Sequence, residues 1–145
     1  MIRKANEKDA EFILGLAKKT PELSVSKTEM WNPTKKEIIE WIKDEKNIFL
    51  VKENKGFLLA KLNSSEWCMI DALAIKLEYR SQGIATELLE ELYSILKEKN
   101  IEYISGLVQE SCMNARAFWN KKGYKEGKKL IWFEKTQTKK TTTTF

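Results

Sequence analysis

Apolar residues recur along the chain with two kinds of spacing, which separate the segments that form helices from those that form strands. Where apolar side chains return every three or four positions, they share one face of a helix. Short, nearly unbroken apolar runs bounded by turn residues are typical of strands. Helices are therefore expected at about residues 6–20, 33–42, 85–99 and 114–122, and strands at residues 2–5, 47–52, 57–62, 67–75, 103–108 and 130–134.

The order of these elements predicts an α/β (α+β) fold of three layers, with a mixed sheet between helices. The run at residues 67–75 is the longest, as expected for a central strand covered on both faces, and it contains a single charge, Asp71. No internal repeat and no linker divides the chain, so residues 1–135 are expected to form one domain. Residues 136–145 are rich in Thr and Lys, have no apolar period and are expected to be a disordered tail.

The composition excludes several kinds of active site. The 145 residues include no histidine and two cysteines, Cys68 and Cys112, so a Ser-His-Asp triad, a Cys-His pair and an ordinary zinc site are impossible. Isolated thiols, the lack of a signal peptide and the lack of an apolar run of about 18 residues indicate a soluble, cytoplasmic protein. The net charge of +5 favours an anionic ligand, but the two signs are interspersed, unlike a nucleic-acid-binding tail.

One segment has the features of a phosphate site. A buried strand that ends at Ile75 runs through a turn containing Gly83 and directly into a helix. The first N–H groups of a helix lack intrahelical acceptors and carry partial positive charge, and Gly83 lets a ligand approach the backbone closely. Arg80 and the Thr86 hydroxyl could assist. The alternative is an ordinary strand–turn–helix connection, which needs a glycine as often as a ligand site does.

Two motifs resemble the signatures of the Gcn5-related N-acetyltransferase (GNAT) family. R-x-x-G-x-A at residues 80–85 resembles the family's Q/R-x-x-G-x-G/A, which lies at the same junction of strand and helix. Residues 114–124, with the sequence NARAFWNKKGY, resemble its second signature, N-x-x-A-x-x-F-Y-x-x-x-G-F, and residues 71–75 look like its fourth strand. The resemblance covers about residues 1–135. It implies a GNAT-like fold with a mixed, mostly antiparallel sheet of six or seven strands flanked by about four helices.

The resemblance also implies an acetyl-CoA-dependent enzyme that moves the acetyl group directly to a primary amine of a small molecule or protein, without an acyl-enzyme. A backbone N–H near Ile75 would polarise the thioester carbonyl, and residues 73–75 would pair with the pantetheine arm. Amides of residues 81–86 would hold the pyrophosphate, with help from basic side chains such as Arg116 and Lys121. The implied cofactor-binding residues are Leu73, Ala74, Ile75, Arg80, Ser81, Gln82, Gly83, Ile84, Ala85, Thr86, Asn114 and Trp119, and no metal is implied.

Asp71 is the candidate for the base that takes a proton from the amine. It lies four residues before Ile75, where related enzymes often have Glu. Partial burial would raise its pKa from about 3.9 towards a useful value. The alternative is an Asp at a solvated strand end or one paired with a lysine. Glu66 and Glu110, on neighbouring segments, are reserve candidates.

Two residues depart from the family pattern. Trp119 stands where the family commonly has a Tyr that is proposed to protonate the departing thiolate, and an indole N–H cannot serve as a general acid. Because a thiol has a pKa of about 8.5, the thiolate can leave without a dedicated acid. Cys112 stands where the family usually has Asn, and Asn114 lies two residues later. Cys112 could line the site; the alternative is a small buried residue.

The acceptor groove is expected around residues 22–32, where Glu22, Glu29 and Trp31 would suit an aliphatic amine. The alternative is that Trp31 and Trp41 pack against the sheet. Two other functions stay open. One is an acyl-CoA-binding sensor or regulatory module with little catalysis. The other is a small basic nucleic-acid-binding domain, but the sequence contains neither the basic helix nor the aromatic strand that such domains use. The amine is not indicated, and a monomer and a homodimer are both compatible with the sequence.

Overall fold

A five-stranded sheet forms the centre of the structure, a computed structural model that describes residues 1–24 and 31–137. The strands lie side by side in the order β1-β2-β3-β4-β5. Neighbours are antiparallel except for β4 and β5, which are parallel. The strands are β1 (Ile2–Lys4), β2 (Asn47–Lys52), β3 (Gly56–Leu62), β4 (Trp67–Ile75) and β5 (Tyr103–Gly106).

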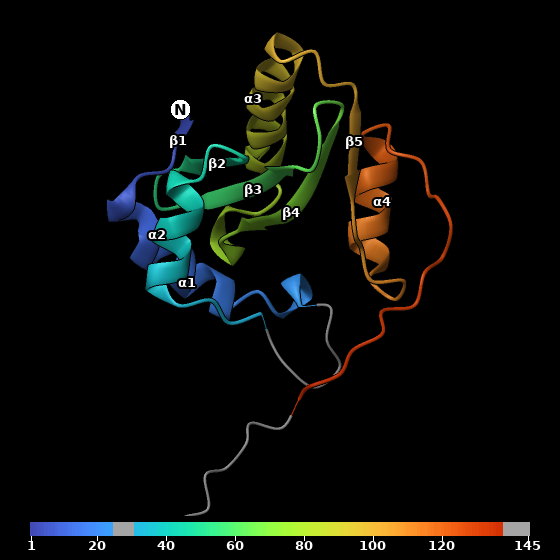
Figure 1. Ribbon diagram of the computed structural model, residues 1–145, viewed down its shortest axis with the longest axis horizontal. Helices are drawn as coiled ribbons and strands as arrows, with labels where there is room; N and C mark the ends of the chain where they lie inside the picture. The colour runs from blue at the N-terminus through green and yellow to red at the C-terminus, as the bar shows by residue number, and fades with distance from the viewer. Residues whose placement is uncertain (25–30, 138–145) are drawn as a thin grey trace, which may run out of the picture.

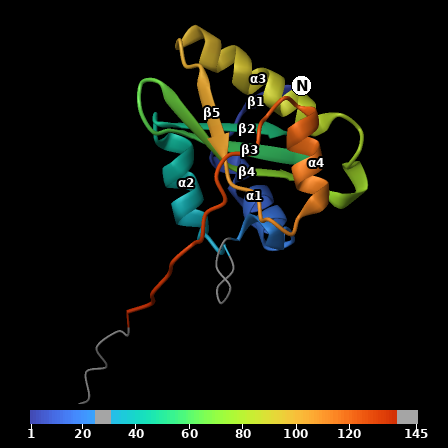
Figure 2. The same cartoon turned by 90° about the vertical axis from the view of Figure 1, so that its right-hand side faces the viewer.

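Helices cover both faces of this sheet. The helices are α1 (Ala10–Lys18), α2 (Lys35–Lys43), α3 (Ile84–Glu98) and α4 (Met113–Lys121). Figure 2 shows α3 above the sheet and α1 and α2 below it, and Figure 1 shows α4 beside β5 at the sheet's end. Among the residues described, no helix combines the length and the apolar character that crossing a bilayer requires.

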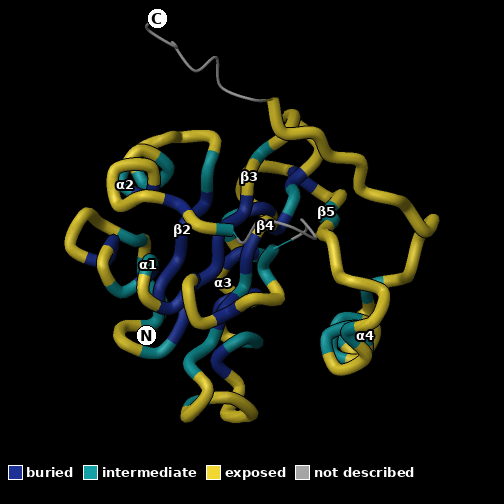
Figure 3. The backbone as a smooth tube through the Cα atoms, turned by 90° about the horizontal axis from the view of Figure 1, so that it is seen from below, coloured by how far each residue is buried: buried dark blue, intermediate teal, exposed yellow. Residues whose placement is uncertain are grey.

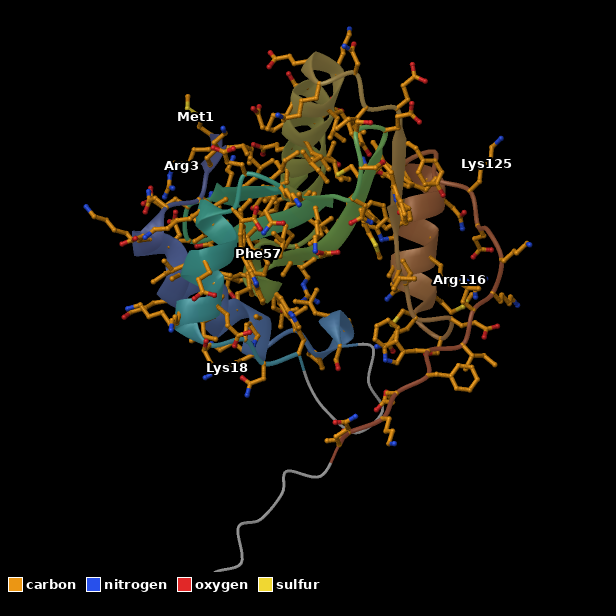
Figure 4. The ribbon with its side chains drawn as sticks, in the orientation of Figure 1. Met1, Arg3, Lys18, Phe57, Arg116 and Lys125 are labelled. Atoms are coloured by element: carbon orange, nitrogen blue, oxygen red, sulfur yellow. The ribbon has the colours of Figure 1, made fainter. Side chains whose placement is uncertain are left out.

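Each face of the sheet has its own apolar core. Alternate residues of β3 divide between the two, with Leu58 on the α3 side and Phe57, labelled in Figure 4, on the side of α1 and α2. The largest contributors from the helices are Leu88 and Leu92 of α3 and Ile13 of α1, all buried completely. Figure 3 shows the buried chain concentrated in the central strands. This two-sided burial confirms the three-layer α/β fold expected from the sequence.

Short polar segments determine where α2 begins and where the β2–β3 hairpin turns. Thr34 caps α2 by accepting from the Glu37 N–H, and the Glu37 carboxylate accepts from the Thr34 N–H in return, which is a capping box. The hairpin between β2 and β3 turns at Asn54, which has the left-handed φ of 58° that Asn tolerates better than most residues. The predicted strands at residues 47–52 and 67–75 have the predicted bounds.

The last predicted strand is the main difference between sequence and structure. Residues 130–134 form no strand, so within residues 1–24 and 31–137 the sheet has five strands rather than six or seven. The strand β5 ends at Gly106 instead of residue 108, because its pairing with β4 ends at Gly106. An apolar run forms a strand only where a ladder partner is available. Of the predicted tail, residues 138–145 lie outside the described residues.

A bidentate ion pair ties the first strand to the first helix. Arg3 donates from Nη1 and Nη2 to the two carboxylate oxygens of Asp9, at 2.7 and 2.8 Å. Asp9 also accepts from the Asn6 N–H at 2.8 Å and is buried. The hydrogen bonds from the Arg3 guanidinium lower the pKa of the Asp9 carboxyl. Burial acts in the opposite direction but is the smaller effect, so the pKa lies below its ordinary value. The ionised carboxylate is therefore part of the folded structure.

Replacing Asp9 with Asn should lower the free energy of unfolding at neutral pH by about 1–2 kcal/mol, because it removes a charged acceptor of three hydrogen bonds. A carboxyl with a depressed folded-state pKa contributes stability above its ordinary pKa of about 3.9 and loses that contribution as the pH falls through the folded value. Urea unfolding of both proteins should therefore show a difference that shrinks in acid.

The matched control is Glu53→Gln. Glu53 also faces Arg3, at 3.8 Å, but its side chain is 75% exposed, so its loss should change stability by less than about 0.5 kcal/mol. Equal effects of the two substitutions would contradict the role assigned to Asp9.

Candidate functional site

The strand β4 contains a bulge at Asp71. Ala72 pairs with Leu59 and Ile70 pairs with Ala60, so two successive residues of β3 lie opposite three residues of β4. Asp71 is the extra residue and has no partner in the ladder. Bulges bend a strand and increase its local twist.

The bulge also changes which face of the sheet the β4 side chains occupy. Cys68 and Ile70 belong to the apolar core on the α3 side, whereas Ala72 and Ala74 belong to the core beneath α1 and α2. In an unbroken strand all four would share one face, because side chains alternate with a period of two. The extra residue therefore exchanges the faces of the residues that follow it, while the apolar cores on both sides of the sheet account for the nearly continuous apolar run at residues 67–75.

Pairing between β4 and β5 ends immediately before this bulge. The last matched residues are Ile70 and Gly106, and Figure 1 shows the two strands diverging beyond them. No strand among the described residues pairs with residues 71–75 on that edge. Unpaired N–H and C=O groups in an extended strand are a template for another extended chain.

Hydrogen bonds show which residues present their backbone to this free edge. The Lys76 N–H donates to the Lys55 carbonyl at 2.8 Å, on the β3 side. Because successive residues of a strand direct these groups to opposite edges, the N–H and C=O of Ile75 point away from β3. The Arg80 Nε agrees with this orientation, since it donates to the Ile75 carbonyl at 3.1 Å. The same alternation directs the backbone of Leu73 to the free edge.

Ala74 differs from its two neighbours. Its carbonyl oxygen points to β3, where it would lie 2.8 Å from a Cβ placed on Gly56. The backbone groups available on the free edge are therefore those of Leu73 and Ile75.

The free edge leads into a turn shaped for an anion. Ser81 and Gly83 both have left-handed φ angles, 64° and 82°, and Gly83 is the N-cap of α3. No side chain caps this helix, so the N–H groups of its first turn are available to a ligand. A Cβ built on Gly83 would meet no atom within 4 Å, which means that the space above the turn is open. With the helix dipole, this arrangement suits a phosphate or pyrophosphate.

Asp71 occupies a partly desolvated position beside this edge. Its side chain is accessible to solvent, yet surrounding protein atoms displace enough water to raise the pKa of the carboxyl, an effect that the Lys61 ammonium opposes. Burial, with a smaller contribution from the Asp71 charge, raises the pKa of the Cys68 thiol to about 11. Cys68 is therefore protonated at neutral pH and acts as a core residue.

The predicted site residues on α4, Asn114 and Trp119, differ in their surroundings. Trp119 packs edge-on between Phe118 and Tyr124, with ring centroids 5.0 and 4.8 Å away, and contacts the core on the α3 side. The Tyr124 hydroxyl shares a 2.6 Å hydrogen bond with the Tyr93 hydroxyl of α3. These contacts attach α4 to the domain. Asn114 is exposed in the first turn of α4.

Two other charged candidates, Arg116 and Glu110, already form ion pairs. The Arg116 Nε donates to the Glu126 carboxylate at 2.7 Å, and Glu110 accepts from the Lys129 ammonium at 3.0 Å. Cys112 is the N-cap of α4 and is half-buried. Lys121 is exposed at the end of that helix. Within residues 1–24 and 31–137, no three His, Cys, Asp or Glu side chains gather as a metal site requires.

The predicted acceptor region is only partly described. Trp31 stacks on Trp41 with ring centroids 6.0 Å apart, and both pack against the core beneath α1 and α2. Residue Glu29 lies outside the described residues, and Glu22 is exposed in a single turn of 3-10 helix. Glu66 is exposed just before β4, at the opposite end of the strand from Ile75.

One feature of this region escapes sequence reasoning. Trp67 at the start of β4 lies edge-on to Tyr103 of β5, with ring centroids 6.1 Å apart, and its Nε1 donates to the Ser105 hydroxyl at 2.7 Å. Both rings are exposed. Only the parallel pairing of β4 with β5 brings these residues together, and no local pattern in the sequence indicates that pairing.

Comparison with known proteins finds a family model that matches the sequence and solved structures that share the fold. The model of the acetyltransferase (GNAT) family matches residues 16–124, a span that includes both motifs. Curated protein sequences give no match.

Solved structures with the same fold include acetyltransferases for different acceptors. The aminoglycoside antibiotic 6'-N-acetyltransferase AAC(6')-IG from Acinetobacter haemolyticus has a TM-score of 0.73 and 16% identity, over 95% of this chain and 99% of that one. The ribosomal-protein-S18-alanine N-acetyltransferase from Escherichia coli has a TM-score of 0.69 and 17% identity, over 88% and 79%. The PaiA N-acetyltransferase from Thermoplasma acidophilum, in complex with coenzyme A, has a TM-score of 0.71 and 21% identity, over 86% and 89%. At these identities the likeness is one of fold.

The left-handed conformation at Gly83 can be tested by stability alone. Gly83→Ala should lower the free energy of unfolding by about 1–2 kcal/mol, because a Cβ is unfavourable at a φ of 82° even where space is open. Gly15→Ala, in the interior of α1 with open space and no positive φ, should instead raise it by about 0.5–1 kcal/mol. Urea titrations of the two variants measure both changes, and equal signs would contradict the assigned turn.

Proposed function

The chain belongs to the acetyltransferase (GNAT) family and is an enzyme of the acyltransferase class, and we propose that it moves the acetyl group of acetyl-CoA directly to a primary amine. The supporting observation is the continuity of two features. The free edge of β4 at Leu73 and Ile75 is joined by residues 76–82, which include a turn of 3-10 helix, to the uncapped start of α3 at Gly83. An extended amide-bearing arm suits the first feature, and a pyrophosphate suits the second.

Backbone groups do most of the holding in this proposal. Leu73 offers its N–H and C=O groups to the pantetheine arm, Ile75 offers its N–H to the thioester at the end of that arm, and the amides of residues 81–86 are assigned to the pyrophosphate. Arg80 is exposed next to the turn and adds positive charge. Asn114 and Trp119 are weaker candidates for cofactor contact, because Trp119 is engaged in core packing.

Acetyl-CoA supplies an acetyl group that is already activated as a thioester. The Ile75 N–H, directed to the free edge, is the donor that we assign to its carbonyl oxygen, because a fixed backbone N–H stabilises negative charge without reorganisation. The same residue's carbonyl is held by Arg80, which fixes the orientation of the peptide groups at the strand end.

Asp71 is the base that we assign to the amine. An alkylammonium must lose a proton before its nitrogen can attack, and the bulge places this carboxylate on β4 without a ladder partner. Partial desolvation raises its pKa, which makes the carboxylate a better proton acceptor than a solvated Asp. No side chain is assigned to protonate the thiolate, since Trp119 cannot and a thiol pKa of about 8.5 allows unassisted departure.

The acceptor is proposed to be a primary amine of a small molecule or of a protein. The similar structures include enzymes named for an aminoglycoside and for an alanine of a ribosomal protein, both of which present an amine.

Calorimetric titration with acetyl-CoA tests the cofactor. The wild-type chain should bind with a micromolar dissociation constant, and removal of the pyrophosphate portion of the ligand should abolish binding. Gly83→Val should also abolish it, because the branched side chain would enter the open space over the turn and strain a left-handed residue.

Gly15→Ala is the control that keeps full binding. Undiminished binding by a folded Gly83→Val protein would refute the assigned cradle. Tight binding without transfer to any of a panel of amines would favour the alternative function, an acyl-CoA-binding sensor.

Asp71→Asn should lower kcat by at least about 100-fold, the usual contribution of a general base, while the affinity for acetyl-CoA changes less than about twofold. The rise of rate with pH that accompanies ionisation of the carboxyl should disappear. The free energy of unfolding should not fall. Because the pKa of Asp71 is raised in the folded state, ionisation of this carboxyl destabilises the protein as the pH rises above the ordinary pKa, and a neutral amide removes that destabilisation.

Asp44→Asn, at the exposed end of α2, is the matched control substitution and should leave both kcat and the pH–rate profile unchanged. An unchanged pH–rate profile in Asp71→Asn would remove Asp71 as the base.

A further inference from the structure

A row of side chains crosses the sheet next to the apolar core on the α1 and α2 side. Leu59 of β3 belongs to that core, and Lys61 occupies the next position on the same face, because side chains alternate with a period of two. Lys61 lies opposite Asn47 of β2 and Met69 of β4, and Met69 lies opposite Ser105 of β5. We call these four residues the Lys61 row. Residues opposite one another share a face, so the row forms the surface of the sheet just beyond the core.

Lys61 carries the only charge of this row. The polar side chains beside it are already hydrogen-bonded: the Asn47 amide donates to the Trp41 carbonyl at 3.1 Å, and the Ser105 hydroxyl accepts from the Trp67 Nε1 at 2.7 Å. The Lys61 side chain is exposed, and no carboxylate within residues 1–24 and 31–137 forms an ion pair with it. Its ammonium is therefore available to a ligand.

The bulge in β4 places Asp71 on the same face as Lys61. Asp71 follows Ile70, which belongs to the core on the α3 side, so alternation directs the Asp71 side chain to the opposite face. Met69, two residues earlier, lies opposite Lys61, which makes Asp71 the diagonal neighbour of Lys61. Diagonal neighbours lie about 7–8 Å apart, within reach of a long side chain. The pKa of Asp71 agrees with this proximity, since burial raises it and the Lys61 ammonium acts in the opposite direction.

The charges of Lys61 and Asp71 lie near each other without forming a direct ion pair. Among the described residues Asp71 forms no other ion pair either, so both side chains remain available. A ligand with one positive and one negative group can bind to both at once. In an α-amino acid, one carbon separates the amine nitrogen from the carboxylate carbon, a distance of about 2.5 Å. With a hydrogen bond of about 2.8 Å at each end, such a ligand spans about 8 Å, which matches the spacing of diagonal neighbours.

We propose that Lys61 determines which acceptor the enzyme uses, and that the acceptor is a small amine with a carboxylate next to the amine, as in a free α-amino acid. This inference rests on the proposed function, in which Asp71 takes the proton from the amine. The ammonium of the acceptor lies at Asp71, and its carboxylate accepts from the Lys61 ammonium. The reverse orientation would bring like charges together, so the two side chains also direct the amine towards the thioester assigned to Ile75.

The same two charges disfavour other kinds of acceptor. A polyamine or an aminoglycoside would bring a second cation towards Lys61, where like charges repel. The amino terminus of a peptide has a neutral amide in place of the carboxylate and offers Lys61 no charged partner. The net charge of +5 acts in the same direction, because it attracts anionic groups to the chain. Lys61 therefore selects a free amino acid over the end of a polypeptide.

Steady-state kinetics with amino acids and their matching amides test this selection. Free glycine and glycinamide, or leucine and leucinamide, differ in the negative charge but keep the amine and the side chain. The wild type should acetylate the acids. Lys61→Gln should lower the ratio of kcat/KM for acid to kcat/KM for amide by about fivefold, the effect of one exposed ion pair, whereas Lys61→Arg should keep the wild-type ratio. Comparing the ratio between proteins cancels the difference in amine pKa between acid and amide.

Lys46→Gln is the matched control. Lys46 is exposed at the same end of the sheet, where its carbonyl accepts from the Leu62 N–H at 2.7 Å, and the substitution removes the same charge from the chain. The ratio of acid to amide should stay at the wild-type value in this variant. An unchanged ratio in Lys61→Gln, or an equal fall in both variants, would overturn the role assigned to Lys61.

The NMR shift of the Asp71 carboxyl carbon, followed with pH without any substrate, tests the placement of Lys61 separately from activity. Lys61→Gln should raise the pKa of Asp71, because it removes a cation that favours the ionised form. An unchanged pKa would show that the two side chains do not face each other and would overturn the proposal.

The kinetic experiment also separates this inference from the proposed function. Acetylation of amides or diamines but of no amino acid would refute the selection by Lys61 alone. Failure of the wild type to bind acetyl-CoA, or to acetylate any amine, would refute the proposed function and the selection with it.

Discussion

The extra residue in β4 is the constraint on which the rest of the site depends. With Asp71 inserted, β4 bends away from β5 immediately after Ile70, and its last residues change the face that they present. On both sides of Asp71 the strand stays paired with β3, while no strand of the described residues pairs with the opposite edge of residues 71–75. A regular strand would have continued its ladder with β5 and left no backbone group available for a ligand.

Backbone geometry also explains how a chain without histidine can belong to an enzyme family. The groups proposed to hold and polarise the cofactor are N–H groups at a strand edge and at the start of α3, and every sequence supplies them. What the sequence must provide is the conformation, namely left-handed residues at Ser81 and Gly83 and an uncapped helix start. In the proposed mechanism the demand on side chains then reduces to one carboxylate, Asp71, in a partly desolvated position.

Local patterns were sufficient to predict most elements but not the features that depend on tertiary pairing. The strand at residues 67–75, the start of α3 and the Gly83 turn follow from apolar runs and a glycine. The bulge at Asp71 did not, because a continuous apolar run is compatible with either register. Likewise, nothing local indicates that Trp67 meets Tyr103, since parallel partners are brought together across a helical connection.

The prediction at residues 130–134 shows the same limit from the other direction. Its apolar and aromatic residues have a strong local preference for a strand, but no strand of the described residues pairs with them. At the same time β5 pairs with β4 on one edge and with no strand of the described residues on the other, and Tyr103 at its start is exposed. Strand formation at residues 130–134 and completion of the sheet at β5 are therefore a single problem of pairing, which no local pattern in the sequence can decide.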